Sequence, residues 1–431
     1  MIITYLSLRK KVFLKILLVY PPIFRSANIY STTLPLGLLH VATYLQNEGN
    51  SVRVLNLENG GEIKTVSIKD LRTAYAANDP KQYVFNEESS YRQEFKKAVL
   101  DFQPDLIGFS VATEQIDAAN EMAKDAKKMF PNVKIEMGNI RISPSDWVKQ
   151  VSAAALMIEP DLSFLEGQNT AESFGSVMTS IGCPFSCVYC GSPQQYKRKI
   201  TYFEEDSVRR RLRNGKNMGA KGFYLLDDTI TINIKRAEKI ADILSEFNMP
   251  WRIQTRVESL VNNLHLISYF KDRGCVQMSF GVESGSTRIR KLMKKNLKID
   301  DVLKGVELLR QHDMPYTANF MIGFPSETND DVDDSMAVIK AMKPERISCA
   351  SMVPYHGTEL YIKNPKFVEA ANNWNFCQWS PFNPTFLTDK EGNRIDGPSF
   401  DKINQIYEMV ENINDHVSSK KTFSTVLSNR K

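Results

Sequence analysis

A repeated alternation of apolar runs and helix-like stretches constrains the fold of this chain more than any other feature. From about residue 173 onward, six apolar runs have the length of buried strands, and polar stretches with helical spacing separate them. The predicted strands are Ser176–Ile181, Gly222–Leu226, Trp251–Arg256, Val276–Val282, Tyr316–Gly323 and Arg346–Tyr355. Successive strand–helix units favour a parallel sheet, so we predict an α/β fold with a partial (β/α)6 barrel of the TIM type.

A shorter alternation precedes this region and predicts a second domain of the Rossmann-like, doubly wound kind. Its predicted elements are strands at Phe13–Tyr20, Ser51–Leu57, Leu106–Val111, Val133–Met137 and Ala154–Ile158, with helices at Gly37–Glu48 and Ile116–Met129. Because 431 residues exceed what one hydrophobic core supports, we expect domains at 1–165 and 173–365. A short, mostly helical segment is expected at 366–431.

Composition indicates a globular protein with a mixed surface. The chain has 55 basic and 50 acidic residues, and a net charge of +5 gives no reason to expect a nucleic-acid partner. The run Val12–Tyr20 resembles the core of a signal peptide, but Lys15 interrupts it and Pro21–Pro22 ends it, which favours a buried strand. No run approaches the roughly 20 apolar residues of a spanning helix, so no membrane partner is expected.

The cysteine distribution points to a reducing compartment and a metal site. Three of the six cysteines fall within eight positions and the others are scattered, unlike a disulfide framework, which favours the cytoplasm. The clustered three are Cys183, Cys187 and Cys190, in a loop directly after the first predicted barrel strand. Such thiolates hold iron–sulfur clusters, and three ligands leave a four-iron cluster with one open position. The alternatives are a zinc site, which wants a fourth ligand nearby, and a dithiol pair, which does not need Cys183.

Polar or glycine residues follow the other predicted barrel strands. Because ligands of parallel α/β folds gather at the carboxyl ends of strands, these residues are candidates for one site above the cysteine loop. Each one alone could be a helix cap or a turn residue. The candidates are Asp227, Asp228, Arg256, Glu283, Ser284, Met321 and Gly323, with Tyr355 and His356 as possible substrate contacts.

This cysteine loop and the rim residues resemble the radical S-adenosylmethionine (SAM) superfamily over about residues 173–365. The resemblance implies an enzyme in which the open iron of a four-iron four-sulfur cluster binds SAM. One electron, from a flavodoxin- or ferredoxin-type donor, then cleaves SAM to methionine and a 5′-deoxyadenosyl radical. The resemblance also implies roles in holding SAM: Tyr189 near the adenine, Glu283 and Ser284 at the ribose, Arg256 at the carboxylate, Asp227 or Asp228 at the ammonium, and Met321–Glu327, with Gly323, at the adenine through its backbone.

The N-terminal region resembles the cobalamin-binding domain that precedes many radical SAM cores. The stretches that carry this resemblance are Val19–Pro22, Leu34–Gly49 and Pro104–Ser110. Two features depart from the pattern: Leu38 stands where a cobalt-binding motif would have Asp, and Met137-Gly138-Asn139 replaces a Gly-Gly pair. Cobalamin is therefore a possible cofactor, and a fold without the cofactor is the alternative.

Two enzymatic functions follow from these resemblances. The first is a cobalamin-dependent methyltransferase that acts on an unactivated carbon of a small molecule or natural-product intermediate. The second is a cobalamin-independent dehydratase, epimerase or rearranging enzyme. A transfer-RNA methylthiotransferase is disfavoured because residues 1–182 contain no cysteine. A degenerate, non-enzymatic barrel is disfavoured by the intact cysteine triad.

Overall fold

A computed structural model shows two compact units, Met1–Ser173 with Asn375–Trp379, and Phe174–Trp374 with Ser380–Lys431. The structure describes residues 13–22, 35–57, 90–111, 115–138, 160–165, 175–344, 346–352, 355, 357–364 and 397–418. The predicted strand Ala154–Ile158, His356, Cys377 and Asn139 lie outside these residues.

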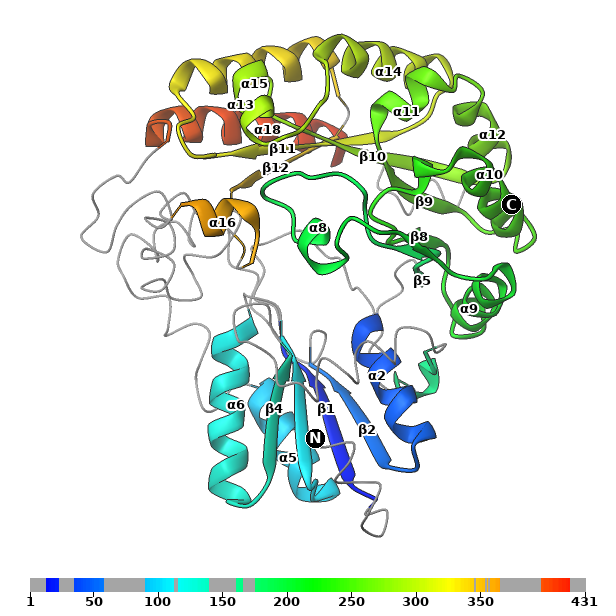
Figure 1. The fold of residues 1–431 in the computed structure, drawn as a ribbon, viewed down its shortest axis with the longest axis vertical. Helices are drawn as coiled ribbons and strands as arrows, with labels where there is room; N and C mark the ends of the chain where they lie inside the picture. Colours follow the sequence, from blue (N-terminus) through cyan, green and yellow to red (C-terminus); the bar gives the residue numbers. More distant parts are fainter. Residues whose placement is uncertain are drawn as a thin grey trace. The chain divides into compact units, whose positions relative to one another are not determined.

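The first unit contains a parallel four-stranded sheet in the order β2-β1-β3-β4 (Figure 1). Its elements are β1 (Lys15–Tyr20), α2 (Leu36–Asn47), β2 (Ser51–Asn56), α5 (Ser90–Phe102), β3 (Leu106–Ser110), α6 (Ile116–Met129), β4 (Lys134–Gly138) and the short η2 (Leu162–Leu165). This α/β arrangement confirms the Rossmann-like prediction. Helix α5 was not predicted, because its polar sequence hides a stripe of three buried apolar residues, Tyr91, Phe95 and Val99.

The core of this unit forms where that stripe meets the central strands. Phe95 packs against Phe109 of β3 with ring centroids 5.8 Å apart, and Leu17 and Val19 of β1 are fully buried beside them. A buried ion pair between Arg92 of α5 and Asp125 of α6, 2.7 Å apart, joins the two helices. Helices and strands of the first unit are thus fastened by both apolar and charged contacts.

The second unit contains a six-stranded parallel sheet whose spatial order, β5-β8-β9-β10-β11-β12, follows the chain. The strands are β5 (Gly175–Val177), β8 (Phe223–Leu225), β9 (Trp251–Thr255), β10 (Cys275–Glu283), β11 (Tyr316–Ile322) and β12 (Arg346–Ser351). Figure 1 shows this sheet curving, with helices along its outer side. The predicted partial barrel is therefore confirmed.

Helices follow the strands in the predicted alternation. They are α9 (Glu205–Asn217), η3 (Ile230–Ile232), α10 (Ile234–Ser245), α11 (Val257–Asn262), α12 (Leu266–Asp272), α13 (Thr287–Leu292), α14 (Ile299–Gln311), α15 (Asn329–Met342), α16 (Glu359–Lys363) and α18 (Phe400–Ser418). The helical spacing over Val257–Arg273 predicts one helix, but the structure has two, because Asn263 has a non-helical backbone (φ −139°, ψ 74°) that ends α11. Gly305 of α14 lets α11 approach, since a Cβ there would lie 2.2 Å from Val257.

The C-terminal helix α18 packs against this second unit. Its Asn414 side chain accepts a hydrogen bond from the Ile347 backbone of β12 and donates one back to the Ile347 carbonyl. Tyr407 and Ser351 share a buried hydroxyl contact of 2.6 Å. None of the described helices is long and apolar enough to span a membrane.

A small antiparallel ribbon interrupts the barrel between β5 and β8. It pairs β6 (Ser180–Ile181) with β7 (Thr201–Tyr202). The predicted first strand, Ser176–Ile181, therefore joins the parallel sheet only up to Val177 and then leaves it. The ribbon marks the two ends of an excursion, residues 182–200, that carries the three clustered cysteines.

Candidate active site

The cysteine excursion is closed at its base by a glycine. Gly182 has φ +92°, and a Cβ at this position would lie 2.0 Å from the carbonyl oxygen of Lys199, so only glycine fits. Farther along, the Cys190 N–H donates to the Cys187 carbonyl at 3.2 Å, which turns the chain into the short helix α8 (Ser192–Gln195). The sequence therefore folds the excursion into a narrow loop that returns to its starting point.

The three cysteines are free thiols that lie near one another. Cys187 is buried, whereas Cys183 and Cys190 are half-buried. Burial raises the pKa of Cys183, and burial raises that of Cys190 to about 11; Cys187 adds to both shifts. Cys183 and Cys190 are therefore neutral until a metal takes the place of their protons.

The donor set fits an iron–sulfur cluster better than a single metal ion. Among the described residues, no three His, Cys, Asp or Glu side chains lie close enough to hold one ion. A cluster instead binds each thiolate to a different iron, so its ligands stand farther apart. Thiolates without histidine or carboxylate partners are the usual ligands of such clusters.

Asp227 holds the start of the excursion in place. Its carboxylate accepts hydrogen bonds from the Thr179 N–H at 2.9 Å, the Thr179 hydroxyl at 2.7 Å and the Ser180 hydroxyl. The residue is 1% exposed, and burial raises its pKa. Because its oxygens already have three donors, Asp227 is poorly suited to the predicted role at the SAM ammonium.

Asp228 faces the cysteine side instead. Its carboxylate accepts a hydrogen bond of 2.8 Å from Ser192, the first residue of α8. Its charge also raises the pKa of Cys183 and of Cys190, after the larger effect of burial. Of the two predicted carboxylates, Asp228 is thus the exposed one and lies within electrostatic reach of the thiols.

Arg256, at the end of β9, lies against the cysteine excursion. Its guanidinium stacks over the Phe185 ring, 3.9 Å from the centroid, and pairs with Glu258. Its charge lowers the pKa of Cys183, although burial dominates that shift. Glu258 was not predicted from the sequence. Because Arg256 donates to Glu258, fewer of the Arg256 N–H groups are left for a carboxylate ligand.

Glu283 meets two partners at the end of β10. Lys295 lies 3.2 Å from its carboxylate, and the two side chains are only 8% and 13% exposed. Tyr189 lies near the same carboxylate: burial, followed by the Glu283 charge, raises the pKa of Tyr189. The structure thus brings the predicted residues Tyr189 and Glu283 together. It also adds Lys295, a buried lysine that the sequence did not single out among its basic neighbours.

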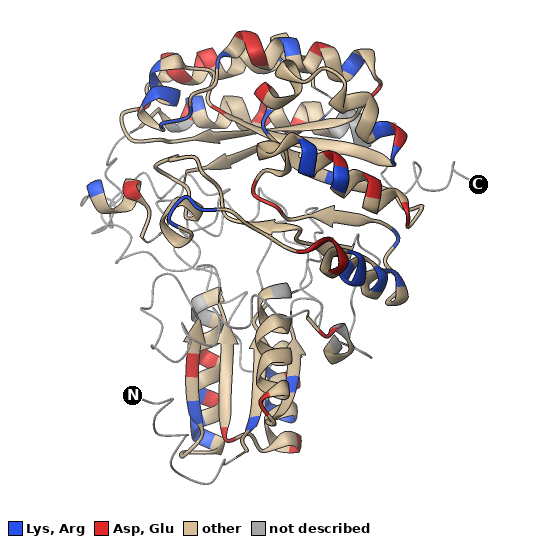
Figure 2. Cartoon of the chain, turned by 45° about the vertical axis from the view of Figure 1, so that its right-hand side comes forward, with Lys and Arg blue, Asp and Glu red and all other residues tan. Residues whose placement is uncertain are grey.

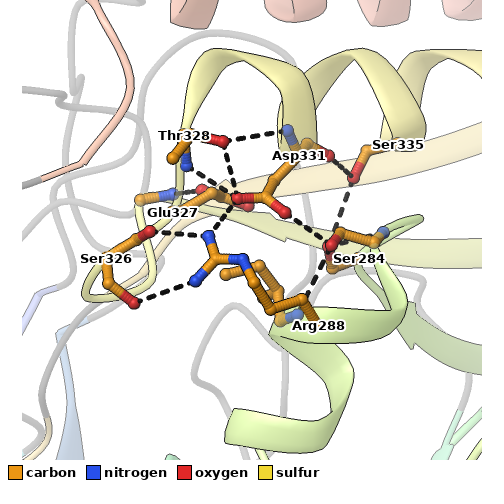
Figure 3. Close-up of polar contacts among 10 residues, drawn as sticks. Ser284, Arg288, Ser326, Glu327, Thr328, Asp331 and Ser335 are labelled. Atoms are coloured by element: carbon orange, nitrogen blue, oxygen red, sulfur yellow. Dashed lines mark hydrogen bonds and ion pairs between the residues drawn. The ribbon is translucent and has the colours of Figure 1, made fainter.

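Ser284 is enclosed in the turn that follows β10. It is 0% exposed, and its hydroxyl accepts a hydrogen bond from the Ser286 N–H at 3.1 Å. The neighbouring Gly285 N–H donates to Ser335 of α15, so the turn is fastened to that helix (Figure 3). This enclosed position does not suit the predicted contact with a ribose.

An ion pair joins the same turn to the loop after β11. Arg288 of α13 pairs with Asp331 of α15 and donates to the Ser326 carbonyl at 2.7 Å (Figure 3). Although burial opposes it, hydrogen bonds from Arg288, Ser286 and Thr328 lower the pKa of Asp331 to about 2. These contacts fix the spacing between the ends of β10 and β11.

The end of β11 turns sharply at Gly323, which has φ +89°. Its N–H donates to one oxygen of Glu327, whereas the other oxygen, Oε1, is buried and has no hydrogen-bond partner among the described residues. Glu327 is 2% exposed, and burial raises its pKa to about 8. Met321, the other predicted residue here, is half-buried on β11. The neutral carboxyl group of Glu327 therefore holds the turn that was predicted to face the adenine.

Comparisons with known proteins agree with this geometry. The radical SAM superfamily model matches residues 177–339, and the B12 binding domain model matches residues 24–163. The chain is 24% identical over 412 residues to an uncharacterized methyltransferase of Pyrococcus horikoshii, and the match covers 81% of this chain and 82% of the relative. It is 21% identical to the anaerobic magnesium-protoporphyrin IX monomethyl ester cyclase of Cereibacter sphaeroides, of which it spans 59%.

Solved structures show the same fold at low identity. TsrM, a radical SAM methyltransferase of Kitasatospora setae, has a TM-score of 0.59 and 13% identity, with 88% of this chain and 84% of TsrM covered. OxsB, a cobalamin-dependent SAM radical enzyme, has a TM-score of 0.54 and 14% identity, with 93% of this chain and 62% of OxsB covered. At this level of sequence identity, the similarity shows a shared fold and no more.

Fold and site together fit a domain that holds an iron–sulfur cluster on three thiolates, and the relatives indicate that the protein is an enzyme. The three cysteines lie at the start of a parallel barrel, and Asp228 and Arg256, which follow β8 and β9, lie within electrostatic reach of Cys183. The chain carries a radical SAM superfamily domain over residues 177–339, which follows a B12 binding domain over residues 24–163. The predictions of family, enzyme class and cofactors, a four-iron four-sulfur cluster, SAM and cobalamin, are confirmed at the level of these domains.

Proposed function

We propose that this protein is a cobalamin-dependent radical SAM methyltransferase that methylates an unactivated carbon of a small molecule. The observation that carries the proposal is the combination, in one chain, of a B12 binding domain with free cysteines at the start of a radical SAM barrel. When bound, the cluster and SAM supply a 5′-deoxyadenosyl radical, and cobalamin supplies a methyl carrier. The domain boundaries that we propose are 1–165, 173–365 and 366–431.

The names of several relatives support methyl transfer as the reaction. Besides the Pyrococcus protein, they include the cytidylyl-2-hydroxyethylphosphonate methyltransferase of Streptomyces wedmorensis and the bacteriochlorophyllide d C-12(1)-methyltransferase of Chlorobaculum tepidum, at 25% and 23% identity. Their substrates differ from one another in size and charge. We therefore propose a small-molecule substrate without naming it.

We propose the following division of labour among the residues. Cys183, Cys187 and Cys190 hold the cluster, and Asp228 accepts from the SAM ammonium. Arg256 donates to the SAM carboxylate and Glu283 accepts from the ribose hydroxyls, each after loosening its present ion pair. Tyr189, Met321 and Gly323 line the adenine. Asp227 and Ser284 act through the turns that they hold.

Two further proposals follow from the chemistry. SAM cleavage consumes one electron, so the enzyme needs a one-electron donor of the flavodoxin or ferredoxin kind. Free thiols and an oxidisable cluster require a reducing compartment, so we place the protein in the cytoplasm. Tyr355, which we propose contacts the substrate, is 37% exposed.

Cobalamin retention tests the methyltransferase proposal. The protein is reconstituted anaerobically with iron, sulfide and hydroxocobalamin, desalted and examined by absorbance. We expect retained corrinoid bands, and transfer of a labelled methyl group from SAM to the reduced corrinoid. Protein that retains the cluster and cleaves SAM but holds no corrinoid would instead support the cobalamin-independent alternative.

A further inference from the structure

The turn at the base of the cysteine excursion presents three consecutive cations to solvent. Lys197, Arg198 and Lys199 are all exposed. Within the part of the chain that the structure describes, none of the three forms an ion pair. Figure 2 shows this stretch as a blue segment after α8. An unneutralised triplet of this kind attracts negatively charged surfaces.

A longer basic run, Arg209–Arg213 in α9, behaves differently. Arg209 is neutralised by Glu246, 2.9 Å away, and by Glu205 and Asp206 of its own helix. Arg211 is buried, with its guanidinium 4.2 Å from the centre of the Phe203 ring. Arg209 and Arg211 are therefore already ion-paired or buried, whereas the triplet at 197–199 is exposed and forms no ion pair among the described residues.

The backbone of the triplet is strained. Lys197 and Arg198 both have positive φ, 51° and 57°, and the Lys199 N–H donates to the Tyr196 carbonyl at 2.9 Å. This is the pattern of a type I′ turn, whose two central positions favour asparagine and glycine. Long basic side chains occupy both positions despite the steric cost, and such strain concentrates at functional sites.

The turn lies directly beside the cysteines. The Lys199 carbonyl packs against Gly182, and Cys183 is the next residue. On the other side, the Asp228 carboxylate lies close enough to raise the pKa of Tyr196, the first residue of the turn, and the pKa of Cys190. A protein that contacts the triplet would thus approach the excursion that holds the proposed cluster.

We propose that Lys197, Arg198 and Lys199 form the docking surface for an acidic one-electron carrier protein. The inference rests on the proposed function, which requires one electron for each SAM cleaved. The carrier is oxidised by one electron, and the cluster is reduced by one. Electron transfer weakens steeply with distance, so a carrier benefits from docking beside the cysteine excursion. Charge complementarity steers such an encounter and makes its rate and affinity depend on salt.

Binding of a reduced bacterial flavodoxin to the reconstituted enzyme tests the proposal. We expect K197E/R198E/K199E to bind it at least about tenfold more weakly at low salt, with the difference shrinking as salt is raised. The matched control K221E/K235E/K304E makes the same change in net charge at exposed positions elsewhere on the barrel, and should bind like the wild type. Equal affinities of the triplet variant and the wild type, or equal losses in both variants, overturn the proposal.

A second variant separates lost charge from lost structure. K197G/R198G removes two cations and suits the left-handed backbone, so we expect a folded protein with reduced flavodoxin affinity. With dithionite as the reductant, both variants should form 5′-deoxyadenosine at the wild-type rate, because no docking is needed. If wild-type protein binds flavodoxin through the triplet but forms no 5′-deoxyadenosine with dithionite, the proposed function fails while the docking surface stands. Unchanged affinity of K197G/R198G contradicts the docking surface.

Discussion

At the scale of single residues, the site depends on buried carboxyl groups. Glu283 is paired with Lys295, Asp227 accepts from Thr179 and Ser180, and Glu327 accepts from the Gly323 backbone N–H. Among the described residues, no donor reaches the other oxygen of Glu327. Glu327 is therefore a residue at which protonation affects stability.

Glu327→Gln tests that consequence. In the folded protein the Glu327 pKa is about 8, against an ordinary value of 4.5, so the folded state holds a proton that the unfolded state releases between these pH values. Stability of the wild type should therefore fall across this window, by up to about 1.4 kcal/mol per pH unit from this group. Denaturant unfolding should show E327Q gaining on the wild type from pH 5 to pH 8. Parallel pH profiles would contradict a neutral buried carboxyl.

Adjacent lysines allow a matched test of the Glu283 pair. Lys295→Met leaves the Glu283 carboxylate buried without its cation and should cost about 3 kcal/mol in the free energy of unfolding. Lys294→Met breaks an exposed pair with Glu359 and should cost less than about 1 kcal/mol. Equal costs in urea denaturation would show that the Lys295 pair is not buried in solution.

At the scale of elements, the cysteine excursion depends on how its two ends meet. The ribbon of β6 and β7 fixes the ends, and Gly182 allows the carbonyl of Lys199 to pack against it. The loop after β11 is fixed in a similar way, through Arg288 and Asp331. The site is therefore built from loops that are held by specific contacts at their bases.

Two glycines in the excursion give a prediction at this scale. Gly182→Ala places a Cβ 2.0 Å from the Lys199 carbonyl at φ +92°, so we expect it to distort the excursion and lower the iron bound after reconstitution severalfold. Gly191→Ala meets no atom within 4 Å and has φ −76°, so its iron content should match the wild type. Iron and sulfide assays on both variants measure the effect. Normal iron content in G182A would show that the base of the excursion can open without loss.

At the scale of the whole molecule, sequence patterning predicts the architecture better than it predicts side-chain direction. Apolar periodicity and the cysteine spacing predict both α/β units and the position of the metal site. Asp227 and Asp228 are neighbours in sequence, yet one faces the protein interior and the other the thiols, a difference that depends on where β8 ends. Lys295 escaped prediction because its partner, Glu283, is brought to it only by the folded turn.

The central claim is that the three-cysteine excursion supports radical cleavage of SAM, and one measurement tests it most directly. Wild-type protein and Cys187→Ser are reconstituted anaerobically, reduced with dithionite and incubated with SAM, and 5′-deoxyadenosine is quantified by chromatography. We expect 5′-deoxyadenosine from the wild type and none above background from the variant. Wild-type protein that carries a full cluster and still forms no 5′-deoxyadenosine would contradict it.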